Sequence, residues 1–344
     1  MPLPVRPLAA AAVAATAAFA LGMSSPARSL APFTWSNDPG DSVVRAPDAA
    51  VRLTGRAFGR SGHLRVLVTD TRRPIHLPME WTVEPPADVG YRWLPVGTPR
   101  TPVLSGEARL GAGLVAPADP GIYRLSLSAP GWQQEMHELN VITRVPFTEK
   151  RGGYVNGYRM GAWETETDGI ADSYAPPSGF IEVTPENQDL QVSTHFRLRN
   201  FLTKDQFGVW PKYLALDLRL IDKLELVVQE LNLMGIRADY VAVMSGFRTP
   251  AYNVQGLNEG RALLSRHTYG DASDVWIDND RDGYMDDLNL DGRRDTADIV
   301  VVRRAVDRVE ERYPELKGGA GVYPDNGAHG PFIHIDARGT FARW

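Results

Sequence analysis

The stretch SRHTYGDASD, Ser265–Asp274, places a histidine seven residues before a carboxylate, with small residues between them. Near the end of the chain, the strand-like run FIHID, Phe332–Asp336, supplies another histidine. Two imidazoles and one carboxylate can hold Zn²⁺ and leave a fourth position open for water, as a hydrolytic site requires. The sequence therefore predicts a zinc site made by His267, Asp274 and His334.

Strand periodicity explains how these side chains could meet. Successive side chains of a strand point to opposite faces, so the run DVWID separates Asp274 from the apolar residues beside it. In FIHID the same rule puts His334 on one face and leaves Ile333 and Ile335 for the core. If the two strands are neighbours, Asp274 and His334 point to one place, and a loop can bring His267 over it.

Length and composition limit the classes of protein. At 344 residues and 43% hydrophobic content, the chain can bury a large core, and its length suggests two domains. The net charge of -5, with no dominant cluster of Lys and Arg, indicates that nucleic acid is not a partner. Cysteine is absent, which excludes disulfides, thiolate ligands and a catalytic thiol. Any metal must therefore be held by histidines and carboxylates.

The N-terminus has the layout of a secretory signal peptide. Arg6 precedes an Ala-rich apolar run that ends near Leu21 and is followed by small residues. We expect residues 1–31 to be this signal, 32–48 to be a linker, and the protein to be exported, periplasmic or extracellular. An uncleaved anchor is the alternative, but the run is shorter than the ~20 apolar residues that usually span a bilayer. No stable membrane insertion is expected after signal removal.

Residues 49–147 predict an all-β, immunoglobulin-like sandwich. Apolar and polar residues alternate in four short runs, often bounded by Pro, Gly or Asp. These runs are 64–70, 79–85, 122–129 and 138–145. The stretch DPGIYRLSL resembles a strand of bacterial immunoglobulin-like modules. The histidines of this region, His63, His76 and His137, are expected to be surface or packing residues.

A connector and a second domain follow. Residues 148–191 are rich in Gly, Pro, Tyr and Ser, with 179–184 as their clearest strand. Apolar residues at helical spacing from Leu214 to Leu231 predict a helix, which Gly235 would cap. A strand is expected at 240–244 and another helix at 297–312.

Three ordered blocks carry a family resemblance. They are SGFRTP at 245–250, SRHTYGDASD at 265–274 and GGAGVYPDNGAHGPFIHIDARGTFARW at 318–344. They resemble the zinc D-alanyl-D-alanine carboxypeptidase and murein endopeptidase family, above all its YcbK-like branch, and VSTHFRLRNFL at 192–202 is similar to that branch's entry segment. The resemblance implies that 192–344 has the α+β hedgehog/D-Ala-D-Ala peptidase fold with a central antiparallel sheet. It also implies zinc at the three predicted ligands and cleavage of peptidoglycan stems or cross-links.

Other catalytic roles follow from the same resemblance. Arg248, in the SGFR block, would bind a carboxylate or carbonyl of the substrate, because a guanidinium can make a bidentate contact. Many relatives place a general base two or three residues before the last zinc histidine, where this chain has Phe332 and Pro331. Two candidates remain for that base, His329 and Asp336. His329 is slightly preferred, because a neutral imidazole can both accept a proton and stabilise a developing oxyanion.

The segment DNDRDGYMDDLNLDGRRDTAD, residues 278–298, predicts a calcium-loop insertion in this domain. One frame has oxygen ligands at alternate positions and a closing acid: Asp287, Asn289, Asp291, Asp295 and Asp298, with Gly292 at the turn. The overlapping frame offers Asp278, Asp280, Asp282 and Asp286 but ends on Asn289. The alternative is a solvated acidic loop, which would leave closely spaced carboxylates to repel one another.

Two functions are consistent with these features. The first is a zinc-dependent peptidoglycan peptidase, acting as an endopeptidase or a D-specific carboxypeptidase. The second is a non-hydrolytic, zinc-containing module that binds cell-wall or protein ligands.

Overall fold

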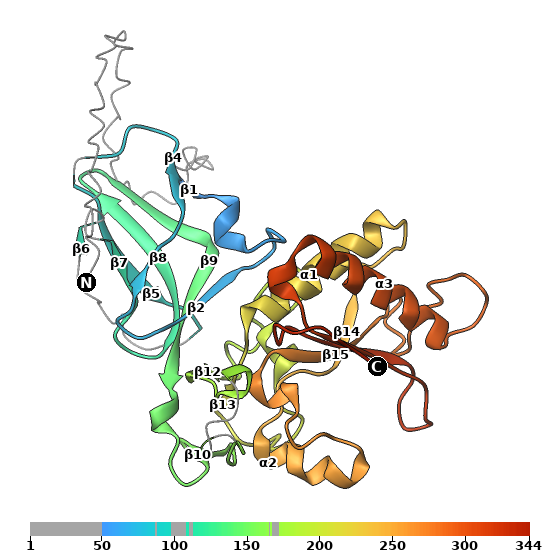
Figure 1. Ribbon diagram of the computed structural model, residues 1–344. Helices are drawn as coiled ribbons and strands as arrows, with labels where there is room; N and C mark the ends of the chain where they lie inside the picture. The colour runs from blue at the N-terminus through green and yellow to red at the C-terminus, as the bar shows by residue number, and fades with distance from the viewer. Residues whose placement is uncertain (1–49, 87, 98–107, 110–112, 165, 167–171) are drawn as a thin grey trace, which may run out of the picture. The chain divides into compact units, whose positions relative to one another are not determined.

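The computed structural model describes residues 50–344 apart from 87, 98–107, 110–112, 165 and 167–171. All of them belong to one compact unit, Ser42–Trp344. The predicted signal peptide, 1–31, and linker, 32–48, lie outside the described residues. Within these residues, the chain runs from a β-rich N-terminal region into a C-terminal region of mixed helices and strands (Figure 1).

The long strand β9 (Trp132–Pro146) is the centre of the N-terminal sheet. One edge pairs antiparallel with β8 (Gly121–Ala129), which β5 (Gly90–Pro95) and β6 (Ala108–Arg109) extend. The other edge pairs in parallel with β2 (Val66–Asp70). Two separate pairs complete this region: β1 (Val51–Leu53) with β4 (Met79–Trp81), and β3 (Pro74–Ile75) with β7 (Leu114–Val115). The β-rich character predicted for this region is confirmed, whereas the immunoglobulin-like sandwich stays a prediction.

The four strands predicted here are present, but two are shorter than expected, since β2 begins at Val66 and β4 ends at Trp81. Alternation buries Leu125 and Leu127 of β8 in a core that also contains Trp93. The strand predicted at 79–85 ends at Trp81, and Val83 beyond it is 44% exposed. Pro85 and the proline after it lack the N–H group that a paired strand needs, so the strand could not have reached the end of the predicted range.

The predicted connector forms a separate hairpin and adds one strand to the N-terminal sheet. Its hairpin consists of β10 (Tyr154–Val155) and β11 (Tyr158–Arg159). The predicted strand at 179–184 is confirmed as β12 (Gly179–Val183), which pairs with the end of β9 and with β13 (Lys212–Leu214). Leu214 is therefore in a strand, so the predicted helix start was wrong. The helix begins at Leu218 because Asp217 caps it, accepting a hydrogen bond of 2.8 Å from the backbone N–H of Arg219.

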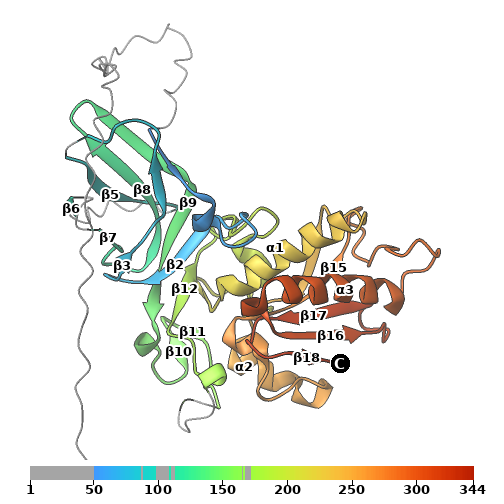
Figure 2. The same cartoon turned by 45° about the horizontal axis from the view of Figure 1, so that its top comes forward.

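Helices α1 (Leu218–Leu233) and α3 (Thr296–Arg312) cover one face of a five-stranded sheet (Figure 2). The strand order is β14 (Val241–Ser245), β15 (Ala272–Ile277), β17 (Phe332–Asp336), β16 (Gly319–Tyr323) and β18 (Ala342–Arg343). Neighbours are antiparallel except β16 and β18, which are parallel. Ile333 and Ile335 are fully buried beneath the helices, as alternation predicts. The α+β prediction for this region is confirmed.

Shorter helices make the turns around these elements. They are η1 (Gly55–Phe58), η3 (Phe147–Glu149), η4 (Asp172–Tyr174), η5 (Leu198–Phe201), α2 (Pro250–Asn253), η6 (Val254–Glu259), η7 (Arg266–Tyr269) and η8 (Pro314–Leu316). Across the part of the chain that the structure describes, none of the helices combines the length and apolar character needed to cross a membrane.

A buried ionic contact ties both long helices to the sheet. Lys223 of α1 is fully buried, and its Nζ lies 2.6 Å from Glu310 Oε1 of α3 and 2.6 Å from the backbone oxygen of Asp336. Glu310 also accepts a 2.7 Å hydrogen bond from Arg343 of β18. These contacts fix the end of β17, the strand that carries His334.

Candidate metal centre

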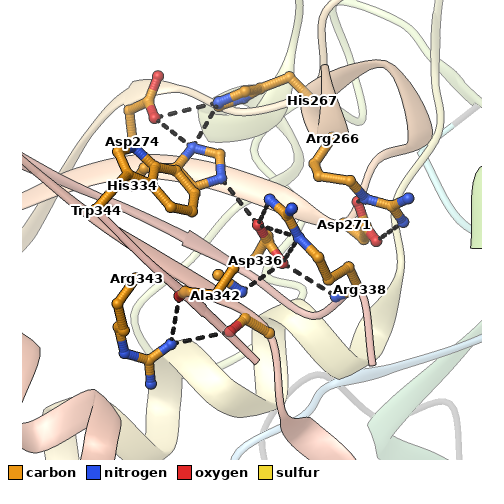
Figure 3. A network of polar contacts seen from close by, with 12 residues as sticks. Arg266, His267, Asp271, Asp274, His334, Asp336, Arg338, Ala342, Arg343 and Trp344 are labelled. Atoms are coloured by element: carbon orange, nitrogen blue, oxygen red, sulfur yellow. Dashed lines mark hydrogen bonds and ion pairs between the residues drawn. The ribbon is translucent and has the colours of Figure 1, made fainter. Parts of the chain in front are cut away.

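The structure brings the three predicted zinc ligands together. Asp274 of β15 and His334 of β17 are direct cross-strand partners, and η7 places His267 beside them (Figure 3). His267 Nε2 lies 3.1 Å from Asp274 Oδ1 and 3.2 Å from His334 Nδ1, and that Nδ1 lies 3.0 Å from the same carboxylate oxygen. All three side chains are buried. Ligand atoms of a tetrahedral zinc site with bonds of about 2.1 Å lie about 3.4 Å apart, so this triangle is close to the size that zinc needs.

Hydrogen bonds on the outer side of each imidazole determine which nitrogen is free to bind. His267 Nδ1 lies 2.7 Å from the carbonyl oxygen of Gly246, and His334 Nε2 lies 3.1 Å from Asp336 Oδ2. Both partners accept, so these ring nitrogens carry the protons and the facing nitrogens of the neutral rings carry lone pairs. Together with Asp274 Oδ1, three lone pairs converge on one point. A divalent cation satisfies such a set, and the residues therefore fit zinc.

The electrostatics of the three ligands support this assignment. Burial lowers the pKa of His267 and favours its neutral form. Burial opposes ionisation of Asp274, but the contacts with His267 and His334 outweigh it and hold the pKa of the carboxyl well below its usual range. Burial also opposes protonation of His334, whereas hydrogen bonds to Asp274 and Asp336 raise its pKa. A metal ion at this position would therefore have to compete with a proton at His334.

Asp336 lies behind His334, at the opposite edge of the ring from the converging atoms. Its side chain is fully buried and also accepts hydrogen bonds from Arg338 Nε (2.9 Å) and the backbone N–H of Gly319 (2.8 Å) (Figure 3). Burial opposes its ionisation, yet the contacts with His334 and Arg338 keep the pKa of this carboxyl below its usual range. An acid in this position orients the imidazole and increases its basicity as a ligand.

Arg248 contacts the metal-ligand carboxylate itself. Its Nη2 lies 2.6 Å from Asp274 Oδ2, the oxygen that does not face the imidazoles, and its Nε donates to Ser245 Oγ at 2.8 Å. The backbone N–H of Arg248 donates to the carbonyl of His267 at 3.1 Å. Arg248 thus orients the Asp274 carboxylate and holds the loop that carries His267.

His329 lies in the loop between β16 and β17. Its Nδ1 is 2.8 Å from the carbonyl oxygen of Gly330, and its ring meets Phe332 edge-on, with 4.8 Å between centroids. Phe332 shares its face of β17 with His334, so His329 lies next to the aromatic neighbour of a ligand. Among the contacts of the described residues, none joins His329 to the triad.

Sequence reasoning gave no role to Trp344, whose ring packs 5.4 Å from that of His334, centroid to centroid (Figure 3). Its Nε1 donates to the hydroxyl of Tyr323 at 2.8 Å. A Cβ at Gly321 would lie 2.3 Å from the indole, so this glycine is what allows the approach. The GGAG run was the available signal, because closely spaced glycines in a strand indicate that another group approaches the backbone.

In the acidic segment, the carboxylates that converge are not those of the favoured calcium frame, which began at Asp287. Oxygens of Asp278, Asp280 and Asp286, from the overlapping frame, lie within 4.8 Å of one another. Asp298 is fully buried and accepts hydrogen bonds from the backbone N–H groups of Leu288 (2.8 Å), Asn289 (3.2 Å) and Asp295 (2.8 Å). Asp298 therefore belongs to the capping box of α3.

The remaining predicted ligands of this segment hold its turns together. Asp287 accepts hydrogen bonds from the backbone N–H groups of Asp291 and Gly292 at 3.1 and 2.8 Å. Asn289 Oδ1 accepts one from Asp291 at 2.9 Å. Asp282 pairs with Arg294 at 2.5 Å. Asp295 caps the start of α3 by accepting from Ala297 at 2.7 Å. The structure thus gathers three acids of one frame and uses the other frame chiefly for turns and caps.

Comparisons with known proteins do not place this chain in a family. No family model matches it, and neither the curated proteins nor the solved structures give a significant match. The functional assignment therefore depends on the chemistry of the site and on the motif resemblance.

Proposed function

We propose that this protein is an exported zinc metallopeptidase that cleaves peptide bonds in the stem peptides or cross-links of peptidoglycan. The observation that supports this most is the convergence of three ligand atoms, with their lone pairs fixed by outer hydrogen bonds. The resemblance of the SGFRTP, SRHTYGDASD and C-terminal blocks to murein peptidases supplies the substrate class. The predicted signal peptide would take the protein to the compartment where peptidoglycan lies.

Each residue around the centre has a proposed role. Zinc bound there would lower the pKa of a water ligand to about 7 and polarise the scissile carbonyl. His267, Asp274 and His334 hold the ion, and Asp336 orients His334. His329 is the preferred candidate for the general base, because Asp336 already accepts hydrogen bonds from Gly319, His334 and Arg338. Arg248 would bind the substrate through donors not used by Asp274 and Ser245.

Digestion of peptidoglycan fragments tests this proposal. We expect the zinc-loaded protein without residues 1–31 to release products that mass spectrometry identifies as cleaved stems or cross-links. The His267→Ala variant should lose this activity, and the matched His137→Ala change, at an exposed histidine of β9, should retain it. Absence of zinc-dependent products from the folded wild-type protein would contradict the assignment. The mass of each product would also distinguish endopeptidase from carboxypeptidase action.

The second candidate function is a non-hydrolytic zinc module that binds cell-wall or protein ligands. It is favoured by the packing of His329 against Phe332 and by the lack of a described contact between His329 and the triad. A sedimentation assay with intact peptidoglycan separates the two functions. Zinc-dependent binding without any released product would favour the module, whereas product release would favour the enzyme.

We further propose that calcium binds the acidic segment through Asp278, Asp280 and Asp286. Asp278 follows β15, and its oxygens accept hydrogen bonds from the backbone N–H groups of Asp282 (3.0 Å) and Gly283 (3.2 Å). Carboxylate oxygens in a tight turn are the ligands that Ca²⁺ prefers. An ion there would stiffen the end of the strand that presents Asp274.

A further inference from the structure

A second group of metal-type ligands lies outside the triad, at His63, His195 and Glu225. The three residues come from the loop after η1, the segment before η5 and helix α1. Glu225 Oε2 lies 2.7 Å from His195 Nδ1 and 3.6 Å from His63 Nδ1. One ligand atom from each residue lies within 4.8 Å of the other two. The two imidazoles thus turn the same kind of nitrogen toward one carboxylate oxygen. His63 Nδ1 also contacts Thr194 Oγ1 at 2.9 Å, a hydrogen bond that a metal ion at this nitrogen would replace.

The loop that carries His63 is held in place by contacts that do not involve these ligands. The backbone N–H groups of Arg60 and Ser61 donate to the Asp222 carboxylate at 2.7 and 2.8 Å. Gln229 Nε2 donates to the carbonyl of Ser61 at 2.9 Å. Asp222 and Gln229 lie one turn on either side of Glu225 along α1, so one helix face binds the loop and presents the carboxylate. The ligand positions are therefore set before any ion binds.

Burial differs between the carboxylate and the imidazoles. The Glu225 side chain is fully buried, whereas those of His63 and His195 are 35% and 21% exposed. The backbone N–H of His195 donates to the other oxygen, Glu225 Oε1, at 2.8 Å. The two rings are nearly parallel, 12° apart, with 6.2 Å between their centroids. An ion could reach the site from the imidazole side, while the buried carboxylate supplies the opposite charge.

We propose that His63, His195 and Glu225 form a second metal site that binds Zn²⁺ or a similar late first-row ion. Two imidazoles and one carboxylate suit zinc, nickel or copper, whereas calcium and magnesium prefer oxygen ligands alone. Binding displaces the proton between His195 Nδ1 and Glu225, which leaves to solvent. The ion would fasten the loop after η1 to α1. The proposal does not depend on peptidase activity.

The test uses a variant in which the triad of His267, Asp274 and His334 cannot bind zinc. The His267→Ala/His334→Ala variant, checked for folding by circular dichroism, is dialysed against zinc in excess calcium and analysed by elemental mass spectrometry. We expect about one equivalent of zinc per chain, because the three ligands form a single site. Adding His63→Ala should remove that equivalent, and adding His137→Ala, at an exposed histidine, should keep it.

Thermal denaturation provides a second readout on the same variants. Zinc should raise the melting temperature of the triad-free protein but not that of the His63→Ala derivative, because ligands that bind only the folded state stabilise it. A triad-free protein that retains no zinc would overturn the proposal. Retention of zinc by a His63→Gln/His195→Gln derivative would also overturn it, since the ion would then lie elsewhere. Neither result bears on the peptidase proposal, because the triad is absent throughout.

Discussion

Asp336 and His334 show how one side chain can determine what another binds. The carboxylate holds the outer nitrogen of the imidazole at 3.1 Å, which leaves the inner nitrogen to face His267 and Asp274. The same carboxylate is fixed by Arg338 and by a backbone N–H group. The geometry of the candidate ligand set therefore depends on a residue outside that set.

We predict that Asp336→Asn weakens zinc binding about 10–100-fold, because an amide keeps the shape of the partner but loses its charge. Competition with a chromophoric chelator would measure the dissociation constant. Asp307→Asn is a matched control, since Asp307 is a half-exposed acid that pairs with Arg343 away from the triad. Equal zinc affinities for the two variants would show that Asp336 does not tune the site.

The His195–Glu225 pair predicts a pH window for the stability of the metal-free protein. The hydrogen bond to Glu225 raises the pKa of His195 above its ordinary 6.5, so its contribution is complete below pH 6.5 and is lost as pH rises through the folded-state value. Burial opposes ionisation of Glu225, but His195 and nearby donors bring its pKa below 4.5. That contribution is complete above pH 4.5 and is lost as pH falls through the folded-state value.

The pair should therefore stabilise the metal-free fold most between pH 4.5 and 6.5. Melting temperatures of the wild type and His195→Gln, recorded with chelator across this range and about two units beyond it, test the prediction. The difference between the two proteins should be largest inside the window and smaller on either side. A difference that is constant with pH would rule out the ion pair as its source.

At the scale of elements, β16 is the strand that brings Trp344 against His334. Gly321→Ala would place a Cβ 2.3 Å from the indole, which the fold can accept only by moving the tryptophan. We expect a loss of about 1–3 kcal/mol in the free energy of unfolding, measured in urea. Gly330→Ala, in the loop after the same strand, meets nothing within 4 Å and should cost much less. Comparable losses would mean that the close packing is not needed.

The acidic segment gives a second prediction at this scale. Calcium at about 100 times its dissociation constant should stabilise the wild type by roughly 2.7 kcal/mol, seen as a higher melting temperature. Asp280→Asn should remove most of this gain, because it withdraws an exposed carboxylate from the converging set. Asp325→Asn, at an exposed acid of another loop, should retain it. An unchanged wild-type melting curve after chelation and calcium readdition would argue against a calcium site.

Sequence reasoning worked for elements whose signal is local and periodic. Strands β15 and β17 alternate clearly, and their pairing placed Asp274 opposite His334 as expected. Sequence reasoning was less successful where one pattern fits two structures. Asp295 and Asp298 have the spacing of both a calcium loop and a capping box. Strand β13 was not predicted, because its three residues are too few to show an alternating pattern and Leu214 also fits the helical spacing that follows. The contacts of Trp344 depend on pairs distant in sequence.

For the whole molecule, Lys223 is the charge that connects α1, α3 and the end of β17. Burial lowers its pKa, and Glu310 opposes that effect. Lys223→Met should cost about 1–3 kcal/mol in unfolding free energy, because it removes one of the two cations that contact the buried Glu310 and leaves the carbonyl of Asp336 without its donor. Arg219→Met, on the same helix, breaks a pair that is 55% and 26% exposed and should cost no more than about 1 kcal/mol. Equal costs would show that Lys223 is not a central tie.

Because Asp274 and His334 are directly paired across two strands, the register of those strands limits which insertions the chain can accept. Adding a single amino acid between Ile333 and His334 would turn the imidazole toward the helices and destroy the centre, because strand faces alternate. Between Ile277 and the start of α3, by contrast, the described chain forms turns, where a change of length shifts no strand register. Protein engineering should therefore have far more freedom in that acidic segment than inside β15 or β17.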